Sequence, residues 1–252
     1  MDDLHGVRAL ITGGTSGLGL AMAEGLTEAG ARVAVTGRSA DRVAAAASAI
    51  GQDTVGIVMD SRDEGSVTAG TAAAWDALGD IDLLVNNAGI GMRTVNPDFM
   101  TAPQCFWDVT ADGFRDVVDT NLTGYFLVAR AVVPRMLRAG HGRIVTISMN
   151  HGTMNRRGFV PYGPSRAGAE ALARIMAADL ADTPVRANIL LPGGATATGM
   201  LGGTARPGGL DVLSPDVMRD PIRWLASAEA ADVHDERIVA TEFASWVAAR
   251  RR

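Results

Sequence analysis

Short apolar runs alternate with longer alanine-rich segments along most of this chain, and this alternation admits few fold classes. The apolar runs lie at 7–12, 31–37, 54–60, 81–87, 142–148 and 185–193. They lack the regular polar alternation of a strand with one wet face, so each predicts a strand buried on both faces. Helical composition fills 18–29, 40–50, 64–78, 112–139, 164–182 and 215–227. The pattern predicts an α/β fold, a doubly wound parallel sheet with helices on both faces.

Length and composition narrow the possibilities further. With 252 residues and 47% hydrophobic composition, the chain is expected to form one domain over 1–252. The net charge of −5 argues against a nucleic-acid partner. Because the chain has no leader-like start and no apolar run of membrane-spanning length, we expect a cytoplasmic protein with no membrane partner. Cys105 is the only cysteine, which excludes an internal disulfide and a cysteine metal cluster, and no metal site is predicted.

A glycine-rich turn follows the first predicted strand directly. The sequence "TGGTSGLG" at 12–19 leads into a helical segment, and glycines there permit a sharp turn and close approach of a diphosphate to the helix amides. Ordinary tight turns use glycine too, but the position within a βαβ unit favours a dinucleotide site. The residues of this turn predicted to bind the dinucleotide are Gly13, Thr15, Ser16, Gly17, Leu18 and Gly19.

The end of the second strand indicates which dinucleotide is bound. Where a carboxylate would bind the adenosine ribose of NAD, the chain has Gly37 followed by Arg38. A guanidinium binds a 2′-phosphate well, so the sequence predicts NADP(H) in preference to NAD(H). The alternative interpretation is that Arg38 is a solvent-exposed arginine in a loop and binds no phosphate. After the third strand, Asp60 either accepts from the adenine amino group, with Ser61 beside it at the cofactor, or caps the next helix.

Five motifs in fixed order carry a family resemblance. They are "TGGTSGLG", "NNAG" at 86–89, "NLTG" at 121–124, "PYGPSRAG" at 161–168 and "PG" at 192–193. Together they resemble the classical short-chain dehydrogenase/reductase family over about residues 5–240. The resemblance implies a Rossmann fold, interconversion of a small-molecule carbonyl and a secondary alcohol with NADP(H), and a homodimer or homotetramer paired through 112–139 and 164–182.

The resemblance also assigns further cofactor contacts. It implies that Asn87, Ala88 and Gly89 pack beside the adenosine half, and that a threonine flanks the nicotinamide together with Pro192 and Gly193. Thr198 follows Pro192 by six residues, one more than the family spacing, which suggests an insertion near Gly194 and leaves Thr196 as a competitor.

Tyr162 is the expected acid/base of the reaction. The family's tyrosine exchanges a proton with the substrate oxygen, and a neighbouring cation favours its phenolate. The usual partner is a lysine four residues later, and here that residue is Arg166, which is always charged but bulkier and effectively never deprotonated. Both residues are also expected at the cofactor. Asn121 resembles the family's asparagine that interrupts a long helix and holds a water in the proton relay, or it makes a backbone hydrogen bond.

The hydroxyl that normally polarises the substrate oxygen is out of register. The family's serine lies thirteen residues before the tyrosine, and that position is Met149. Ser148 is one residue away, and because side chains alternate along a strand, it serves only if the loop compensates. Asn150 and His151 are alternative donors, although a surface histidine is the simpler interpretation of His151.

These departures leave two functions open. The first is an NADP(H)-dependent oxidoreductase with Tyr162, Arg166, Asn121 and Ser148 as catalytic residues. The second is a non-catalytic NADP(H)-binding protein, a sensor or scaffold, which Met149 and Arg166 motivate. A sugar-nucleotide epimerase fits less well because the chain lacks an added substrate domain.

The irregular stretch 91–111, together with 199–214, is expected to shape the substrate site. Its phenylalanine, tryptophan and methionine content suggests that the substrate is a partly apolar molecule.

Overall fold

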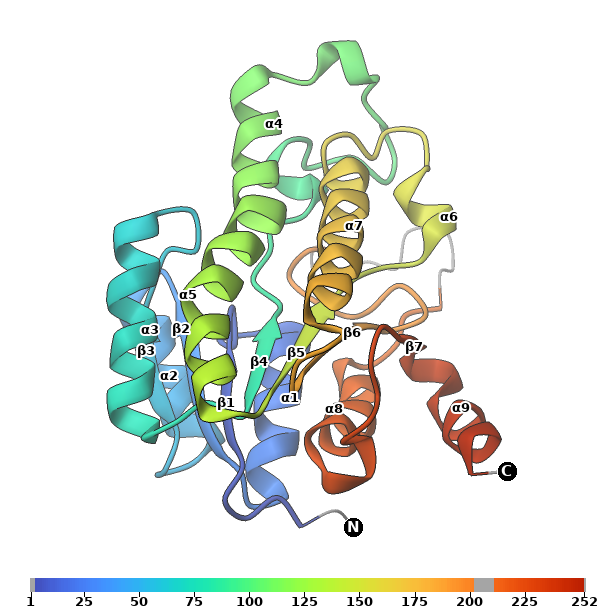
Figure 1. Cartoon of the computed structure of the whole chain (residues 1–252). Helices are drawn as coiled ribbons and strands as arrows, with labels where there is room; N and C mark the ends of the chain where they lie inside the picture. Colours follow the sequence, from blue (N-terminus) through green and yellow to red (C-terminus); the bar gives the residue numbers. More distant parts are fainter. Residues whose placement is uncertain (1–2, 202–210, 252) are drawn as a thin grey trace.

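The strands form one parallel sheet, as the alternating pattern predicts. The computed structural model describes residues 3–201 and 211–251. The strand order is β3-β2-β1-β4-β5-β6-β7 (Figure 1). The strands are β1 (Arg8–Ile11), β2 (Arg32–Gly37), β3 (Val55–Val58), β4 (Leu83–Asn86), β5 (Gly142–Ile147), β6 (Val185–Leu191) and β7 (Arg237–Val239). The order reverses direction between β1 and β4, and ligands of such sheets bind at this point, beyond the carboxyl ends of the strands.

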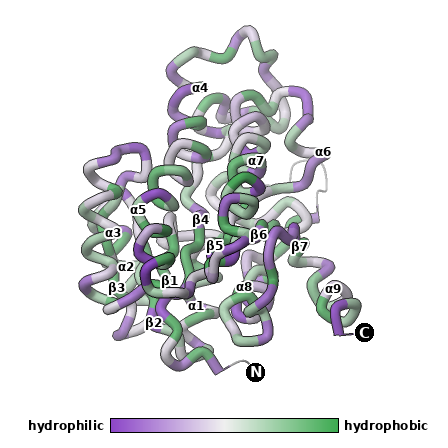
Figure 2. Tube along the Cα trace, viewed as in Figure 1, coloured by the Kyte–Doolittle hydropathy of each residue, from purple (hydrophilic) through white to green (hydrophobic). Residues whose placement is uncertain are grey.

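Helices cover both faces of the sheet. They are α1 (Gly17–Glu28), α2 (Ala40–Ile50), α3 (Glu64–Leu78), α4 (Ala111–Val118), α5 (Gly124–Ala139), α6 (His151–Met154), α7 (Tyr162–Leu180), α8 (Arg219–Ala226) and α9 (Phe243–Arg250). One core lies between the sheet and α1 and α8, and the other lies between the sheet and α3, α5 and α7. Successive strand residues enter opposite cores: Leu84 faces the second and Val85 the first. Figure 2 shows the resulting hydrophobic character of β4.

The edge strand β3 departs from the expectation of full burial. Val58 is 53% exposed, whereas Ile57 is buried in the core beneath α3. The strand pairs only with β2 in the described sheet, so its outer side has no neighbouring strand and half of its residues face solvent.

The helical segments also differ from their predicted bounds. The predicted helix at 112–139 is divided by a π-helical turn, Asp119–Thr123, between α4 and α5, and this turn contains Asn121, which the family resemblance places at an interruption of a long helix. The predicted helix at 215–227 begins with a 3-10 turn, Pro215–Met218, before α8. The sequence pattern missed β7 and α9 altogether, because a three-residue edge strand and a short terminal helix carry little periodicity.

The stretch after β4 forms a long loop that rises above α4 in Figure 1. It contains 3-10 turns at Met92–Thr94 and Phe106–Asp108. Phe106 and Trp107 contact each other edge to face and are 66% and 70% exposed. Phe99 turns inward and contacts Phe159 with ring centroids 5.7 Å apart. In the described part of the chain, no helix has the length and apolar character needed to cross a membrane.

Candidate active site

The glycine-rich turn lies directly against the segment that follows β4. Gly13 and Gly17 have φ angles of +65° and +57°, which side chains other than glycine rarely tolerate. A Cβ on Gly13 would lie 2.7 Å from Ala88 Cα, and one on Gly19 would lie 2.4 Å from Asn87 Nδ2. Missing side chains therefore allow two of the predicted cofactor segments to meet at the switch point of the sheet.

Thr12 and Asn87 hold these segments together. The Thr12 hydroxyl oxygen accepts from the backbone amides of Asn87 and Ala88, both at 3.0 Å. In return, Asn87 Nδ2 donates to the carbonyl oxygens of Thr12 and Gly13 at 2.9 and 3.1 Å. Sequence reasoning did not single out Thr12, although its place at the end of the first apolar run was visible.

The start of α1 is suited to an anion. Ser16 occupies the N-cap position, but its hydroxyl makes no capping bond to the helix, and the first turn carries no acidic side chain. Instead, Ser16 Oγ accepts from Arg42 Nη2 at 3.1 Å. The helix amides and the positive end of the helix dipole thus remain available. Together with the glycine cradle, these residues fit the diphosphate of a dinucleotide.

Two arginines lie where the second strand ends. A Cβ on Gly37 would lie 2.8 Å from Thr15 Cγ2, so this strand end contacts the glycine-rich turn. Arg38 follows and is exposed, and Arg42 lies in the first turn of α2. Within residues 3–201 and 211–251, neither guanidinium has a carboxylate within salt-bridge distance. Arg42 was missed, although its spacing of four from Arg38 was the available signal.

Asp60 has a different partner from either one expected. Its carboxylate accepts from Arg62 at distances from 2.7 to 3.2 Å, and these hydrogen bonds lower the pKa of Asp60. The prediction that Asp60 might cap the next helix is wrong, because Asp63 occupies that position and accepts from the Ser66 amide at 2.6 Å. Ser61 is buried beside Gly124. The adenine contacts of both residues stay predictions.

The segment after β6 distinguishes the two competing threonines. Thr198 Cγ2 lies 3.0 Å from the position that a Cβ on Gly17 would take, so Thr198 lies at the glycine-rich turn. Thr196 is buried, and its hydroxyl donates to the Gly194 carbonyl at 3.2 Å. Between Pro192 and Gly194, Gly193 has a φ of +98°. The geometry favours Thr198 as the threonine near a cofactor.

Tyr162 and Arg166 meet as their spacing predicts. Tyr162 is the first residue of α7, and Arg166 follows one helical turn later. The guanidinium carbon lies 5.3 Å from the centroid of the Tyr162 ring. Arg166 is only 3% exposed, whereas Tyr162 is partly exposed and its hydroxyl lies 3.8 Å from Met200 Sδ. A buried cation thus lies beside a more accessible phenol.

A second tyrosine holds the Arg166 guanidinium. Arg166 Nη1 donates to Tyr125 Oη at 2.6 Å and to the Ile147 carbonyl at 3.1 Å, while its buried Nε has no partner. Nη2 lies over Gly89, where a Cβ would approach it to 2.4 Å. Among the described residues, no carboxylate lies within salt-bridge distance of Arg166. Tyr125 is 1% exposed and was not anticipated from the sequence.

Burial and charge act in opposite directions on this pair. Burial by itself lowers the pKa of Arg166, but the oxygens of Tyr125 and Tyr162 outweigh burial and leave that pKa raised. Burial raises the pKa of Tyr125 despite the nearby guanidinium. Arg166 therefore stays charged, and Tyr125 stays a neutral phenol at physiological pH.

The Asn121 side chain is fully engaged with neighbouring residues. It lies in the π-helical turn between α4 and α5. Its Oδ1 accepts from the Ile90 amide at 2.9 Å, and its Nδ2 donates to the Ile90 carbonyl at 3.0 Å and to Ser165 Oγ at 3.1 Å. The side chain therefore ties the loop after β4 to α7, in agreement with the backbone hydrogen bond considered above. Water binding by Asn121 stays a prediction.

Ser148 and Met149 directly follow β5 and make different contacts. The Ser148 hydroxyl donates to Glu170 Oε1 at 2.5 Å, whereas Met149 packs in an apolar cluster that includes Tyr162. The expectation that Ser148 polarises a substrate oxygen thus has no geometric support. Asn150 Nδ2 donates to the Gly193 carbonyl at 2.9 Å. His151 is exposed and lies 3.1 Å from Glu170 Oε2.

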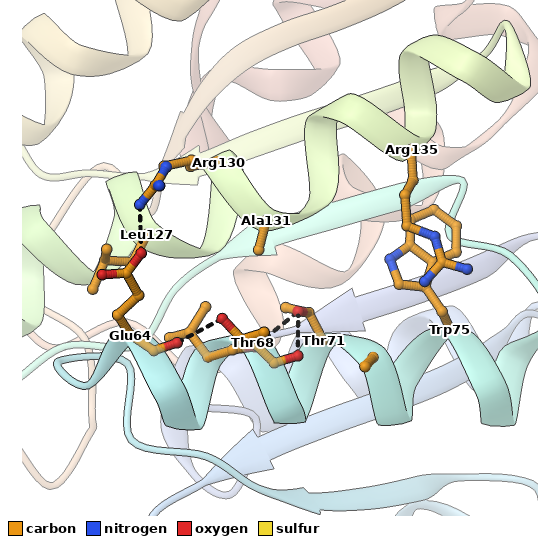
Figure 3. Close-up of a pocket in the computed structure, with 10 residues that line it drawn as sticks. Glu64, Thr68, Thr71, Trp75, Leu127, Arg130, Ala131 and Arg135 are labelled. Carbon is orange, nitrogen blue, oxygen red and sulfur yellow. Dashed lines mark hydrogen bonds and ion pairs between the residues drawn. The ribbon is translucent and has the colours of Figure 1, made fainter.

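A separate cavity of about 340 Å³ lies between α3 and α5 (Figure 3). Arg130 pairs with Glu64 at 2.6 Å on one side of it, and the Arg135 guanidinium lies 4.3 Å from the Trp75 ring centroid on the other. None of the candidate cofactor or catalytic residues lines this cavity. It is therefore distinct from the site around Tyr162.

Comparison with known proteins settles the family. The model of the family described as "short chain dehydrogenase" matches residues 8–207. The chain belongs to this short-chain dehydrogenase family. The match includes the glycine-rich turn, Asn121, Tyr162 and Arg166 of this short-chain dehydrogenase, so the resemblance read from five motifs is confirmed.

The relatives of this short-chain dehydrogenase are oxidoreductases. It is 35% identical over 193 residues to gluconate 5-dehydrogenase of Gluconobacter oxydans, covering 75% of this chain and 72% of that protein. It is 31% identical over 244 residues to the 3-oxoacyl-[acyl-carrier-protein] reductase FabG of Vibrio harveyi, covering 94% and 96%. The 3-ketoacyl-(acyl-carrier-protein) reductase of Brucella melitensis, solved with NADH, superposes with a TM-score of 0.83 at 27% identity, covering 94% and 97%.

Proposed function

We propose that this short-chain dehydrogenase uses NADP(H) to interconvert a carbonyl and a secondary alcohol, with Tyr162 as the acid/base. The observation that carries the proposal is the contact between the partly exposed Tyr162 phenol and the buried guanidinium of Arg166. When bound, the nicotinamide supplies or accepts the hydride. The residues of the protein itself orient the substrate and transfer one proton.

Tyr162 donates its proton to the carbonyl oxygen during reduction and takes it back from the alcohol during oxidation. Arg166 stabilises the phenolate that exists between these steps, because its charge is permanent. A lysine at this position can also pass protons, but arginine effectively never deprotonates. The proton therefore returns to Tyr162 from solvent and not from residue 166.

The preference for NADP(H) rests on the charges at the end of β2. Arg38 is exposed, Gly37 offers no carboxylate against a 2′-phosphate, and Arg42 extends the positive charge toward Ser16 of the glycine-rich turn. The diphosphate would bind the amides at the start of α1, over Gly13 and Gly17. Thr198 would lie beside the nicotinamide half.

A homodimer or homotetramer is part of the proposal. Phe126 and Leu137 on α5 and Ile175 on α7 are exposed at 46%, 39% and 59%. These two helices correspond to the segments expected to pair. Size-exclusion chromatography with light scattering tests this directly, since a mass near the 26.2 kDa of one chain would refute it.

The central experiment follows NADPH fluorescence on the purified protein, first during a titration and then over time with a panel of ketones. Saturable binding and a decay that Tyr162→Phe abolishes would support the reductase. The alternative, a non-catalytic NADP(H)-binding protein, is favoured by Met149 at the position of the family's hydroxyl. Tight binding with no turnover of any ketone would support that alternative, and no binding would refute both.

A further inference from the structure

The side chain of Tyr162 packs against an apolar cluster. Met92, Phe99 and Phe159 are buried within it, and the partly buried residues Met100, Met149 and Leu201 pack against them with Tyr162. Tyr162 is the one member of this cluster with a polar side chain. These residues come from three separate parts of the chain: the long loop after β4, the segment from β5 to α7, and the segment after β6.

The direction of the Met149 side chain is fixed by its neighbours. The Ser148 hydroxyl donates a hydrogen bond to Glu170, and the Asn150 side-chain amide donates one to the Gly193 carbonyl. The Met149 carbonyl itself accepts from Arg237 Nη2 at 2.8 Å, and Arg237 Nε also pairs with Glu170 at 3.0 Å. The backbone is thus held on both sides of Met149 and at Met149 itself, and the Met149 side chain packs against the same cluster as Tyr162.

The Tyr162 hydroxyl currently faces a weak acceptor. The hydroxyl donates to Met200 Sδ at 3.8 Å, and a thioether sulfur accepts hydrogen bonds poorly. A carbonyl oxygen that receives the Tyr162 proton must take the place of this sulfur. The groups on either side of that carbonyl then contact thioethers and phenyl rings.

From this arrangement we infer that the substrate is a ketone with apolar groups on both sides of the carbonyl, and that Met149 is a specificity-determining residue. The inference rests on the proposed function, since it concerns the same reaction at Tyr162. In that reaction, the ketone gains a hydride from NADPH at carbon and a proton from Tyr162 at oxygen, and the products are a secondary alcohol and NADP⁺. A hydroxyl next to the carbonyl would lose its water against the cluster without gaining a partner there.

The test compares two ketones that share one ring. Cyclohexanone and 2,3,4,5,6-pentahydroxycyclohexanone differ only in their hydroxyl groups, and NADPH oxidation gives kcat/KM for each. The expected ratio favours cyclohexanone by roughly a hundredfold or more, on the scale by which an apolar site discriminates against an added hydroxyl. A ratio near one, or one in favour of the pentahydroxy compound, would overturn the inference while leaving the reductase activity intact.

Variants test the part assigned to Met149. Met149→Ser should reduce the ratio by about tenfold, as expected for exchanging one apolar contact, while Met149→Leu should keep it. Using a ratio matters because a serine hydroxyl here could accelerate both ketones equally. Val58→Ser is the matched control, since Val58 on the edge strand β3 is exposed and outside the cluster, and should leave the ratio unchanged. An unchanged ratio in Met149→Ser would remove Met149 from specificity.

A binding measurement separates this inference from the proposed function. If no ketone is reduced, the reductase proposal fails, and calorimetry with cyclohexanol and inositol on the protein, with and without NADP⁺, still decides the substrate class. Cyclohexanol binding that Met149→Ser weakens would support an apolar site. Absence of cyclohexanol binding, or stronger binding of inositol, would overturn it.

Discussion

The hydrogen bond between Tyr125 and Arg166 makes a quantitative prediction. Tyr125→Phe keeps the ring and removes one oxygen, so Arg166 Nη1 retains only the Ile147 carbonyl at 3.1 Å. A hydrogen bond to a charged group contributes about 1.5–3 kcal/mol. Arg166 already has an unpartnered buried Nε and is 3% exposed, so water has little access to replace the lost acceptor. We expect the free energy of unfolding to fall by about 2 kcal/mol.

Urea unfolding followed by circular dichroism measures this change, at one fixed protein concentration because subunit association would shift the midpoint. The control is the same substitution in an Arg166→Met background. There the buried Tyr125 hydroxyl has already lost the hydrogen bond from Arg166 Nη1, so removing it should be neutral or stabilising. A loss of about 2 kcal/mol in both backgrounds, or in neither, would refute the coupling between Tyr125 and Arg166.

Four further outcomes are expected. Arg166→Lys should retain turnover and Arg166→Ala should lose both rate and NADPH affinity; unchanged kinetics in the alanine variant would remove Arg166 from the mechanism. Arg38→Asp should shift the ratio of kcat/KM from NADPH toward NADH, and Arg42→Ala should weaken NADPH binding about tenfold with little effect on NADH; an unaltered ratio in Arg38→Asp would mean that another group binds the 2′-phosphate. Gly89→Ala places a Cβ 2.4 Å from Arg166 Nη2 and should destabilise the fold by about 1–3 kcal/mol, read as a lower urea midpoint. Because burial raises the pKa of Tyr125, its share of stability should be complete below about pH 10 and lost as the pH rises further; Tyr125→Phe should flatten that alkaline decline in Tm, and an equally steep decline would contradict it.

The sheet was predictable because its strands carry strong local signals. A buried parallel strand such as β4 is visible as a short apolar run in the sequence, and the glycine-rich turn marks the first crossover. The short strand β7 and the exposed side of β3 were not predictable in this way. Both are edge strands, and a strand's position at the edge depends on the order of strands in the sheet, which its own sequence does not reveal. The π-helical turn at Asn121 also leaves no periodic trace in the sequence.

The candidate site was predictable where it depends on spacing along one element. Tyr162 and Arg166 are four residues apart on α7, and the position of Ser148, one residue from the family's serine, is visible from its distance to Tyr162 along the chain. Tyr125 could not be found this way, because 41 residues separate it from Arg166 and only the packing of α5 against α7 brings them together. The competition between Thr196 and Thr198 likewise required the position of Gly17.

The surroundings of Arg166 have a spectroscopic consequence. The chain contains two tyrosines, and these are Tyr125 and Tyr162, which lie on either side of the same guanidinium. Ultraviolet absorbance of the phenolate therefore reports on this site alone, and one phenylalanine variant for each tyrosine assigns the signal. The wild-type protein thus carries its own optical probe of the candidate active site, without any added label.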